Sequence, residues 1–483
     1  MSDFGALNTA LSALYAHRRA LEVTGQNISN ANTDGYSRQR VDLVADAGPT
    51  LPAIHSPWTG GGQGVDVTSV SRTRDGFLES RALAEHASLA ALDVEKATLA
   101  RVEEALGEPG DSGLQRIMDE YWMMWEQVST NPDLIDMRGS LIEKGREITD
   151  TLNRAVQNFS SIWDSNRELL KATIDDVNVT ASGIAQLNAT IQTAVQGGLS
   201  PNDLMDQRDQ LVMSIAESVG VRVVPGEDGV VNLFVGGSPL VKGKYTEKLQ
   251  VVGPDAFGAI PNPSVGASPH VAVVWAQSGR TAGVTGGSAA GNLSALNSTL
   301  PTYRERLDQV ANKLGTSVNT LHESGYDLDG AAGGGFFGDA VVGPPFFAAS
   351  IRVALTDPRK IAASDVAPAI DPRTGLPVRN LGEGNARAMA LLGNQTGGVN
   401  HVYRSVVADL GQHAGAVNSR SGFQASVVQT LDAQREGFSG VNLDEEMANM
   451  VAFQHAYNGA ARYMSAIDEM LDTLINRTGT VGR

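Results

Sequence analysis

Apolar residues recur along most of the chain at intervals of three, four or seven positions, which is the spacing of one face of an α-helix. The pattern is clear from Asp3 to about Ser29, although Arg18 and Gly25 interrupt it. It predicts one amphipathic helix, which ends in a turn at residues 30–35. The apolar stripe of this helix consists of Phe4, Leu7, Leu11, Leu14, Leu21 and Ile28.

Helical patterning resumes near Arg74 and predicts several long helices before residue 219. One helix stops at the glycines of 107–110, and the next ends at Pro132. Another helix is expected at 202–218. Between Pro132 and the helix at 202–218 lies a much longer apolar repeat, and a repeat of this length predicts a long helical bundle. Its apolar positions are Leu141, Ile148, Leu152, Ala155, Phe159, Ile162 and Leu169, followed by Ile184, Leu187 and Ile191.

The middle of the chain has a different pattern of apolar residues. Short valine-rich runs separated by glycine and proline predict strands over residues 219–285. Helix returns at 292–321, and a Gly- and Pro-rich span then contains one expected strand at 351–355. The order helical, β-rich, helical predicts a mainly α fold with inserted β, in which both chain ends form a long helical bundle or coiled coil.

The last helix carries the most regular pattern. Asn442 can cap its start, with Glu445 three residues later, and Gly479 can close it. A helix with such a stripe cannot bury it alone, so it needs a partner within the chain or in a neighbouring subunit. An ordinary core helix of a bundle and an assembly helix both fit this pattern. The main seam consists of Leu443, Met450, Tyr457, Met464 and Leu471, and a second seam of Phe453, Ala460, Ile467 and Leu474.

Composition narrows the function classes. The chain has 483 residues, no cysteine and a formal net charge of −17. Nucleic acid and anionic membrane surfaces are therefore unfavourable partners, and disulfides and thiolate metal sites are excluded. The longest uncharged stretch, 256–279, is broken by three prolines and cannot form a membrane helix. The first twenty residues lack the features of a secretory signal peptide.

No pattern of catalytic or metal-binding residues stands out. The eight histidines show no metal-ligand spacing, and the sequence lacks nucleophile-elbow and phosphate-loop motifs. Asp327 and Asp329 before Gly330 lack the remainder of a calcium loop, so a solvated turn is expected. Asp206 and Asp209 flank Arg208, which favours an intrahelical salt bridge over an acid dyad. We therefore predict no catalytic, cofactor-binding or metal-binding residues, and no enzyme.

Four segments together resemble a known family. Residues 26–38, read as QNISNANTDGYSR, resemble the N-terminal signature of flagellar rod, hook and hook-associated proteins. Residues 202–221 and 325–337 are similar to parts of the hook-associated protein 1 family. Residues 440–463 resemble the C-terminal helix of that family. Together these segments extend the resemblance over nearly the whole chain. The outer region after residue 325 is much shorter than is usual in the family.

The resemblance implies a structural adaptor that joins hook to filament at the bacterial flagellum. It implies a ring oligomer of the chain itself, with the hook protein and the second hook-associated junction protein as partners, and a flagellar export chaperone at the C-terminal helix. The location implied is extracellular, reached without a cleaved signal peptide, and no nucleic acid or membrane partner is expected. The predicted assembly interface consists of Leu7, Leu11, Leu14, Leu21, Ile28, Leu443, Met450, Tyr457, Met464 and Leu471.

The expected domain organisation follows the same reading. It comprises a terminal helical assembly domain, a helical bundle domain, a β-rich excursion and a small outer region that stands for a reduced outer domain. Two alternatives stay open: a hook or rod axial subunit, and, from a different class, a secreted coiled-coil adhesin. The assembly domain comprises residues 1–45 and 438–483, and the bundle domain comprises residues 46–218, 286–325 and 385–437. The β-rich excursion is 219–285, and the outer region is 326–384.

Overall fold

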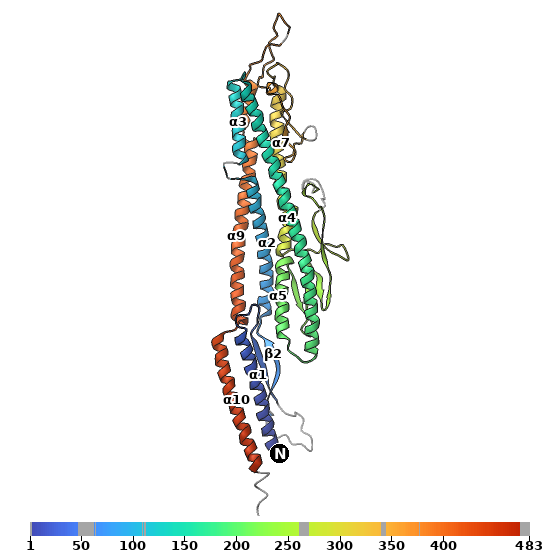
Figure 1. Ribbon diagram of the computed structural model, residues 1–483, viewed down its shortest axis with the longest axis vertical. Helices are drawn as coiled ribbons and strands as arrows, with labels where there is room; N and C mark the ends of the chain where they lie inside the picture. The colour runs from blue at the N-terminus through green and yellow to red at the C-terminus, as the bar shows by residue number, and fades with distance from the viewer. Residues whose placement is uncertain are drawn as a thin grey trace, which may run out of the picture. The chain divides into compact units, whose positions relative to one another are not determined.

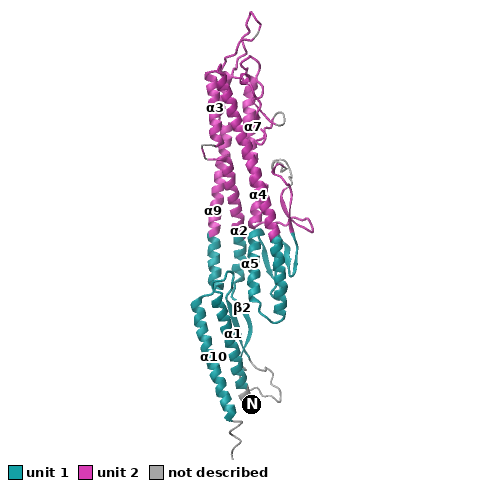
Figure 2. Ribbon diagram, viewed as in Figure 1, with its two compact units in different colours: residues 1–86, 177–248, 426–483 teal, residues 87–176, 249–425 magenta. Residues whose placement is uncertain are grey.

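The computed structural model describes residues 2–46, 62, 64–108, 110, 113–259, 270–339, 344–375 and 377–473. Its described part is mainly helical with small inserted sheets, which confirms the predicted fold class. The chain divides into two compact units (Figure 2). Unit 1 comprises residues 1–86, 177–248 and 426–483, and unit 2 comprises residues 87–176 and 249–425.

The two ends of the chain come together in unit 1. Helices α1 (Ser2–Ser29) and α10 (Leu443–Asp472) pack side by side and run antiparallel (Figure 1). Strands β1 (Gln39–Asp46) and β2 (Gly64–Arg72) form an antiparallel hairpin, and the start of β2 packs on α1, where the Val65 amide donates to Ser12 Oγ at 3.3 Å. The apolar face of α1 is therefore shared between a helix and a hairpin.

Unit 1 also contains α5 (Asn202–Val219) and a four-stranded antiparallel sheet. Gly220 ends α5 with φ of 67°, a left-handed conformation that glycine adopts without steric cost, and its amide donates to Ala216 O at 2.9 Å. The sheet has the order β3-β4-β5-β6. Its strands are β3 (Arg222–Pro225), β4 (Val231–Val235), β5 (Ser238–Lys242) and β6 (Tyr245–Thr246).

Three long helices contribute residues to both units: α2 (Gly76–Leu106), α4 (Ile135–Gln196) and α9 (Val399–Ser439). Unit 2 adds α3 (Leu114–Thr130), α6 (Gly287–Ser294), α7 (Leu300–Ser324) and α8 (Gly384–Leu392). A π-helical turn, Ala295–Thr299, joins α6 to α7. Two small antiparallel sheets complete the unit, formed by β7 (Leu249–Val252) with β8 (Ala272–Trp275) and by β9 (Phe337–Gly338) with β10 (Arg352–Val353).

Aromatic side chains fill the core of unit 2 between α3, α7 and the segment before β9. Trp125 lies with its ring centroid 5.8 Å from Phe336 and 6.3 Å from Tyr121, and His322 is 5.7 Å from Phe336. All four residues are fully buried. Burial lowers the pKa of His322 to about 4, so the imidazole is neutral. Its Nε2 accepts from the Ala362 amide at 3.0 Å, which ties the Gly- and Pro-rich segment to α7.

The long repeat of α4 drifts away from the predicted phase. The heptad places Leu169 on the core face, but its side chain is 52% exposed, whereas Leu170 is fully buried. The buried positions pass from Phe159 to Trp163 and on to Leu170 and Ile174. An α-helix has 3.6 residues per turn, so a strict seven-residue step rotates gradually off a straight core. The prediction at Leu169 is therefore wrong by one residue.

Other element bounds agree with the patterns that predicted them. The expected helix at 202–218 is α5, and the strand expected at 351–355 shortens to β10. Asn442 caps α10, because its side chain accepts from the Asp444 and Glu445 amides at 3.0 and 3.3 Å. The β1–β2 hairpin was not predicted. Gly479 and Leu474 lie outside the described residues.

Candidate functional site

The ten residues predicted as an assembly interface all lie on the α1·α10 helix pair. On α10, Met450, Tyr457, Met464 and Leu471 are half-buried, and Leu443 is exposed. The second seam lies closer to α1: Ile467 is fully buried, and the Phe453 ring lies 6.4 Å from the His17 ring. On α1, Leu7, Leu14, Leu21 and Ile28 are half-buried and Leu11 is exposed. Pairing within the chain thus leaves part of the predicted interface accessible.

Small side chains form the face of α1 that is most deeply buried. Ala10, Ala16, Ala20 and Val23 have almost no exposed surface. Small residues allow a neighbouring backbone to approach closely, and the leucine stripe is displaced to the flank of the pair. Sequence periodicity favours the larger apolar residues and does not identify these small residues as the most buried face of α1. The assembly role of the leucines stays a prediction.

A buried polar cluster closes the pair at the end where α1 stops and α10 starts. We call it the clasp and define it as Asn27, Tyr36, Arg38, Gln39 and Glu446. Asn27 Nδ2 donates to Glu446 Oε2 at 3.0 Å and to Gln39 O at 2.9 Å. Asn27 Oδ1 accepts from the Tyr36 hydroxyl and from the Gln39 amide, both at 2.9 Å. The amide side chain is therefore fully satisfied.

The carboxylate of Glu446 is the charged centre of the clasp. Its side chain is only 3% exposed, and Oε1 accepts from Arg38 Nε at 2.8 Å. The Arg38 amide also donates to Ser439 O at 2.8 Å, just before α10 begins. Burying a carboxylate is unfavourable unless it is paired and hydrogen-bonded. Asn27 in the last turn of α1 and Arg38 in the segment after it supply those partners, which gives a physical reason for the residues of the 26–38 signature.

Tyr36 takes part in the clasp as a neutral hydrogen-bond donor. Burial, followed by the negative charges of Asp203, Asp206 and Glu446, raises the pKa of the phenol to about 12. An unfolded tyrosine ionises near pH 10. The contribution of Tyr36 to stability is therefore complete below about pH 10 and is lost as the pH rises towards 12.

A second charged cluster ties β2 to α5 beside the clasp. Arg72 Nη1 donates to Asp206 at 2.7 Å and to Asp209 at 2.8 Å, and Arg74 also contacts Asp209. Asp206 accepts from the Ser37 amide at 3.1 Å as well. The hairpin and the turn after α1 are thereby held on α5 by the same pair of carboxylates.

Electrostatics keep Asp209 ionised despite its burial. Burial alone would raise the pKa of this carboxyl, but Arg74, Arg72 and Arg208 together hold it below its usual range. Arg208 contacts Asp209 at 3.2 Å, as the predicted intrahelical salt bridge requires. The prediction does not hold for Asp206, because its carboxylate pairs with Arg72 of β2 and not with Arg208. Two carboxylates neutralised by arginines do not form the shared-proton pair of an acid dyad.

Sequence reasoning did not identify Asn27, Arg38 or Glu446 as functional residues. One signal was available, since Glu446 lies seven positions before Phe453 and thus on the second seam. An acidic residue on an apolar seam indicates a buried partner. The identity of that partner depends on a contact between residues 419 positions apart, which sequence periodicity does not encode.

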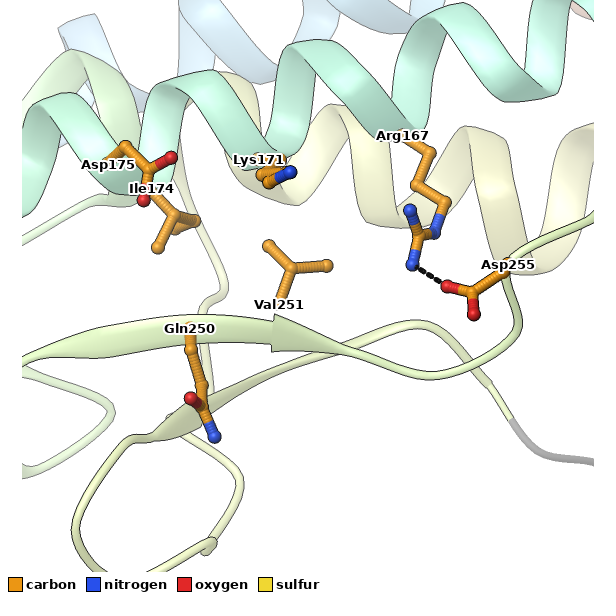
Figure 3. A pocket seen from close by; sticks show the side chains of 7 residues that line it. All are labelled: Arg167, Lys171, Ile174, Asp175, Gln250, Val251 and Asp255. Atoms are coloured by element: carbon orange, nitrogen blue, oxygen red, sulfur yellow. Dashed lines mark hydrogen bonds and ion pairs between the residues drawn. The ribbon is translucent and has the colours of Figure 1, made fainter.

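Unit 2 contains a cleft of about 360 Å³ between α4 and β7 (Figure 3). Arg167 lies at one end, where it contacts Asp255 and donates from Nε to Pro254 O at 2.9 Å. Ile174 and Val251 form its apolar wall, and Lys171 and Asp175 line it from α4. This set of side chains matches no catalytic arrangement of nucleophile and base.

Asp327 and Asp329 form an ion-paired turn. Asp327 Oδ1 accepts from the Asp329 and Ala331 amides at 2.9 and 2.8 Å, and Lys360 pairs with Asp327 at 3.0 Å. Over the residues that the structure describes, no group of three or more His, Asp or Glu side chains is arranged to hold a metal ion. Among the same residues, none of the helices has the length and hydropathy needed to cross a bilayer.

Comparison with known proteins places these features in a family. The sequence model of the hook-associated protein FlgK helical domain matches residues 99–337. Flagellar hook-associated protein 1 of Bacillus subtilis is 30% identical over the whole of both chains. The chain belongs to the flagellar hook-associated protein 1 family. As a member of this family it is a structural component of the bacterial flagellum.

Further matches cover most of the chain. Flagellar hook-associated protein 1 of Escherichia coli is 27% identical over 97% of this chain and 99% of its own. The solved structure of the flagellar hook junction protein FlgK from Burkholderia pseudomallei has the same fold, with a TM-score of 0.62 at 17% identity. It covers 74% of this chain and 100% of that one.

Two models named for flagellar basal body rod proteins match the chain ends. One matches residues 7–36 and the other residues 437–477. These ranges contain most of α1, all of α10 and three of the five clasp residues, Asn27, Tyr36 and Glu446. The clasped helix pair is thus the part of this hook-associated protein 1 family member that resembles rod proteins, whereas residues 99–337 resemble its own family.

Acidification is expected to weaken the α1·α10 pair through His17. Nδ1 of this residue is buried without a hydrogen-bond partner in the described part of the chain, and burial lowers the pKa of His17. Because the unfolded imidazole binds a proton near pH 6.5, this contribution to stability is present above that pH and is lost as the pH falls below it. Hydrogen exchange of the α1 and α10 amides between pH 7.5 and 5.5 measures the effect.

Replacing His17 by phenylalanine should make that exchange less dependent on pH, because the ring stays beside Phe453 without a group that can be protonated. His455, which is exposed on α10, provides the control. His455→Phe should leave the pH dependence as it is. Equal pH dependence in His17→Phe and the unsubstituted chain would show that His17 does not control the pair.

Proposed function

We propose that this chain is a non-enzymatic adaptor subunit that joins the hook to the filament of the bacterial flagellum. The observation that carries the proposal is the division of the chain between two kinds of match. The clasped ends match basal body rod models, and the region between them matches the hook-associated FlgK helical domain. A subunit of this type uses the shared ends to continue the axis and its own middle region to define its position.

The partners follow from that role. The chain forms a ring with further copies of itself, and it contacts the hook protein on one side and the second hook-associated junction protein on the other. Its predicted interface residues on α1 and α10 mediate this assembly. Before assembly, the C-terminal helix binds a flagellar export chaperone. The protein then acts outside the cell, at the hook-filament junction, and is exported without a cleaved signal peptide.

The proposed domains assign one task to each part. Residues 1–45 and 438–483 form the assembly domain at the inner tube. Residues 46–218, 286–325 and 385–437 form the bundle domain, residues 219–285 are a β-rich excursion, and residues 326–384 are a reduced outer domain. The clasp supports the first assignment, because it fixes the two ends of the chain to one another before any neighbour is present.

Deleting the gene in its host tests the junction role. Filament subunits should then be released into the medium while hooks remain intact and motility is lost, because the filament has no attachment point. Electron microscopy of the cell surface and gel analysis of the medium measure both effects. Normal filaments on the deletion strain would refute the proposal, and loss of hooks as well would indicate a hook or rod subunit instead.

A further inference from the structure

The cleft between α4 and β7 borders a strand edge that no other strand covers among the described residues. There β7 pairs only with β8, in an antiparallel two-stranded sheet. Gln250 and Val251 point to opposite faces of β7, and Val251 points towards α4 (Figure 3). Both residues line the cleft. The cleft therefore lies against the open edge of β7 as well as against the face that packs on α4.

The pairing on the far side of β8 shows which backbone groups point to this open edge. The Trp275 amide donates to Arg280 O at 2.9 Å. Val273 O accepts from the Ala282 amide, also at 2.9 Å. Val273 and Trp275 thus direct their backbone groups away from β7. These groups alternate between the two sides of a strand, and Val251 lies opposite Val273, so the N–H and C=O of Val251 point away from β8. A donor and an acceptor at an open strand edge are a template for a further strand.

The segment after β7 is fixed in place, so the cleft is formed before any partner binds. Arg167 Nε donates to Pro254 O at 2.9 Å, and the same guanidinium contacts Asp255. Phe257 is buried, and its ring centroid lies 6.2 Å from that of Trp163. A binding surface that is already ordered loses less conformational entropy when a partner binds.

Two charged side chains of α4 line the cleft without an ion pair. Neither the Lys171 nor the Asp175 side chain has a partner within the part of the chain that the structure describes. They lie one helical turn apart, about 6 Å along α4. Alternate side chains of an extended strand are about 7 Å apart and point to the same face. A strand lying along the cleft can therefore place an acidic residue at Lys171 and a basic residue at Asp175, with the apolar wall of Ile174 and Val251 beside them.

We propose that this cleft binds an extended segment of a partner protein, which adds to β7 as a further strand. The segment makes main-chain hydrogen bonds with the N–H and C=O of Val251. One of its acidic residues faces Lys171, and a basic residue two positions away faces Asp175. In recognition of this kind, main-chain pairing supplies affinity and alternate side chains supply specificity. The inference goes beyond the proposed function, because it concerns unit 2 alone and needs no second copy of the chain.

A synthetic peptide tests the proposal on the purified full-length chain. The probe has seven residues of threonine and valine, blocked at both ends, except for one aspartate and, two positions later, one lysine. Residue-resolved hydrogen exchange of the Val251 amide should slow when the peptide is added. The Gln250 amide points to β8, so its exchange should stay unchanged and provides the internal control. The same peptide with N-methylated amides keeps both charges but cannot donate main-chain hydrogen bonds, so it should not slow exchange at Val251.

A charge substitution tests the side-chain contacts by fluorescence anisotropy of the labelled peptide. Lys171→Glu should weaken binding by about fivefold, because an attractive charge pair becomes a repulsive one. Lys313→Glu makes the same change on α7, where the residue does not line the cleft, and should leave binding unchanged. Unchanged exchange at Val251, equal binding of the N-methylated peptide or equal effects of the two substitutions would overturn the proposal. So would slowing at Val251 that depends on the concentration of the chain alone, since this would assign the edge to a second copy.

Discussion

Replacing Glu446 by alanine is expected to separate the two ends of the chain and to abolish entry into flagella. The substitution removes the carboxylate that accepts from Asn27 and Arg38, so Asn27 Nδ2 keeps only Gln39 O and Arg38 keeps only the exposed Glu445. A hydrogen bond to a charged group contributes about 1.5–3 kcal/mol, and the substitution removes two of them. Hydrogen exchange of α1 and α10 should rise towards that of an isolated helix, while exchange in unit 2 stays unchanged.

The neighbouring Glu445 provides a matched control. Its side chain also pairs with Arg38, at 2.9 Å, but it is 58% exposed. Exposed ion pairs contribute about 0–1 kcal/mol, so Glu445→Ala should leave α1 and α10 protected and the chain competent for assembly. Equal effects of the two substitutions would show that burial of Glu446 is irrelevant and that Arg38 pairing alone matters.

Replacing Trp125 by alanine should destabilise unit 2 by about 3–5 kcal/mol, the usual range for a large aromatic residue removed from a core. Trp125 is fully buried and contacts the rings of Tyr121, Phe336 and His322. Thermal unfolding followed by near-ultraviolet circular dichroism measures the loss. Hydrogen exchange should place the change in α3 and α7 and leave the α1·α10 pair as it was.

Met123 lies two residues earlier on the same helix, and its side chain is exposed. Met123→Ala changes the same element without opening a cavity, so it should shift the free energy of unfolding by less than about 0.5 kcal/mol. A similar loss of stability in both variants would mean that helix propensity, and not the aromatic core, governs α3.

The sequence predicted the helices well because periodicity is a local property. The seven-residue steps from Leu443 to Leu471 predicted α10, and Asn442 predicted its first residue correctly. The β1–β2 hairpin was missed even though Val65, Val67 and Asp66 alternate in the manner of a half-buried strand. The glycines at 60–62 and 64 are typical of a loop, and the segment has no helical repeat.

The site was less accessible to sequence reasoning than the fold. Periodicity identifies which residues of α10 face a partner, but not which residues of α1 receive them. The answer depends on size, because Ala16 and Ala20 allow close approach whereas the leucines of α1 lie on its flank. The clasp could not be predicted either. Arg38 and Glu446 are brought together by the return of the chain through both units, and only the structure shows that path.

The clasp can form only late in synthesis, because it joins the two ends of the chain. Asn27 and Glu446 are 419 positions apart, so α1 is synthesised long before the residue that closes it. The entropy cost of bringing such distant ends together grows only slowly with chain length, so the sequence separation does not prevent the contact once α10 has formed. A product that ends before residue 443 would contain α1 without α10. The clasp is therefore present in a full-length subunit and absent from a subunit truncated before α10.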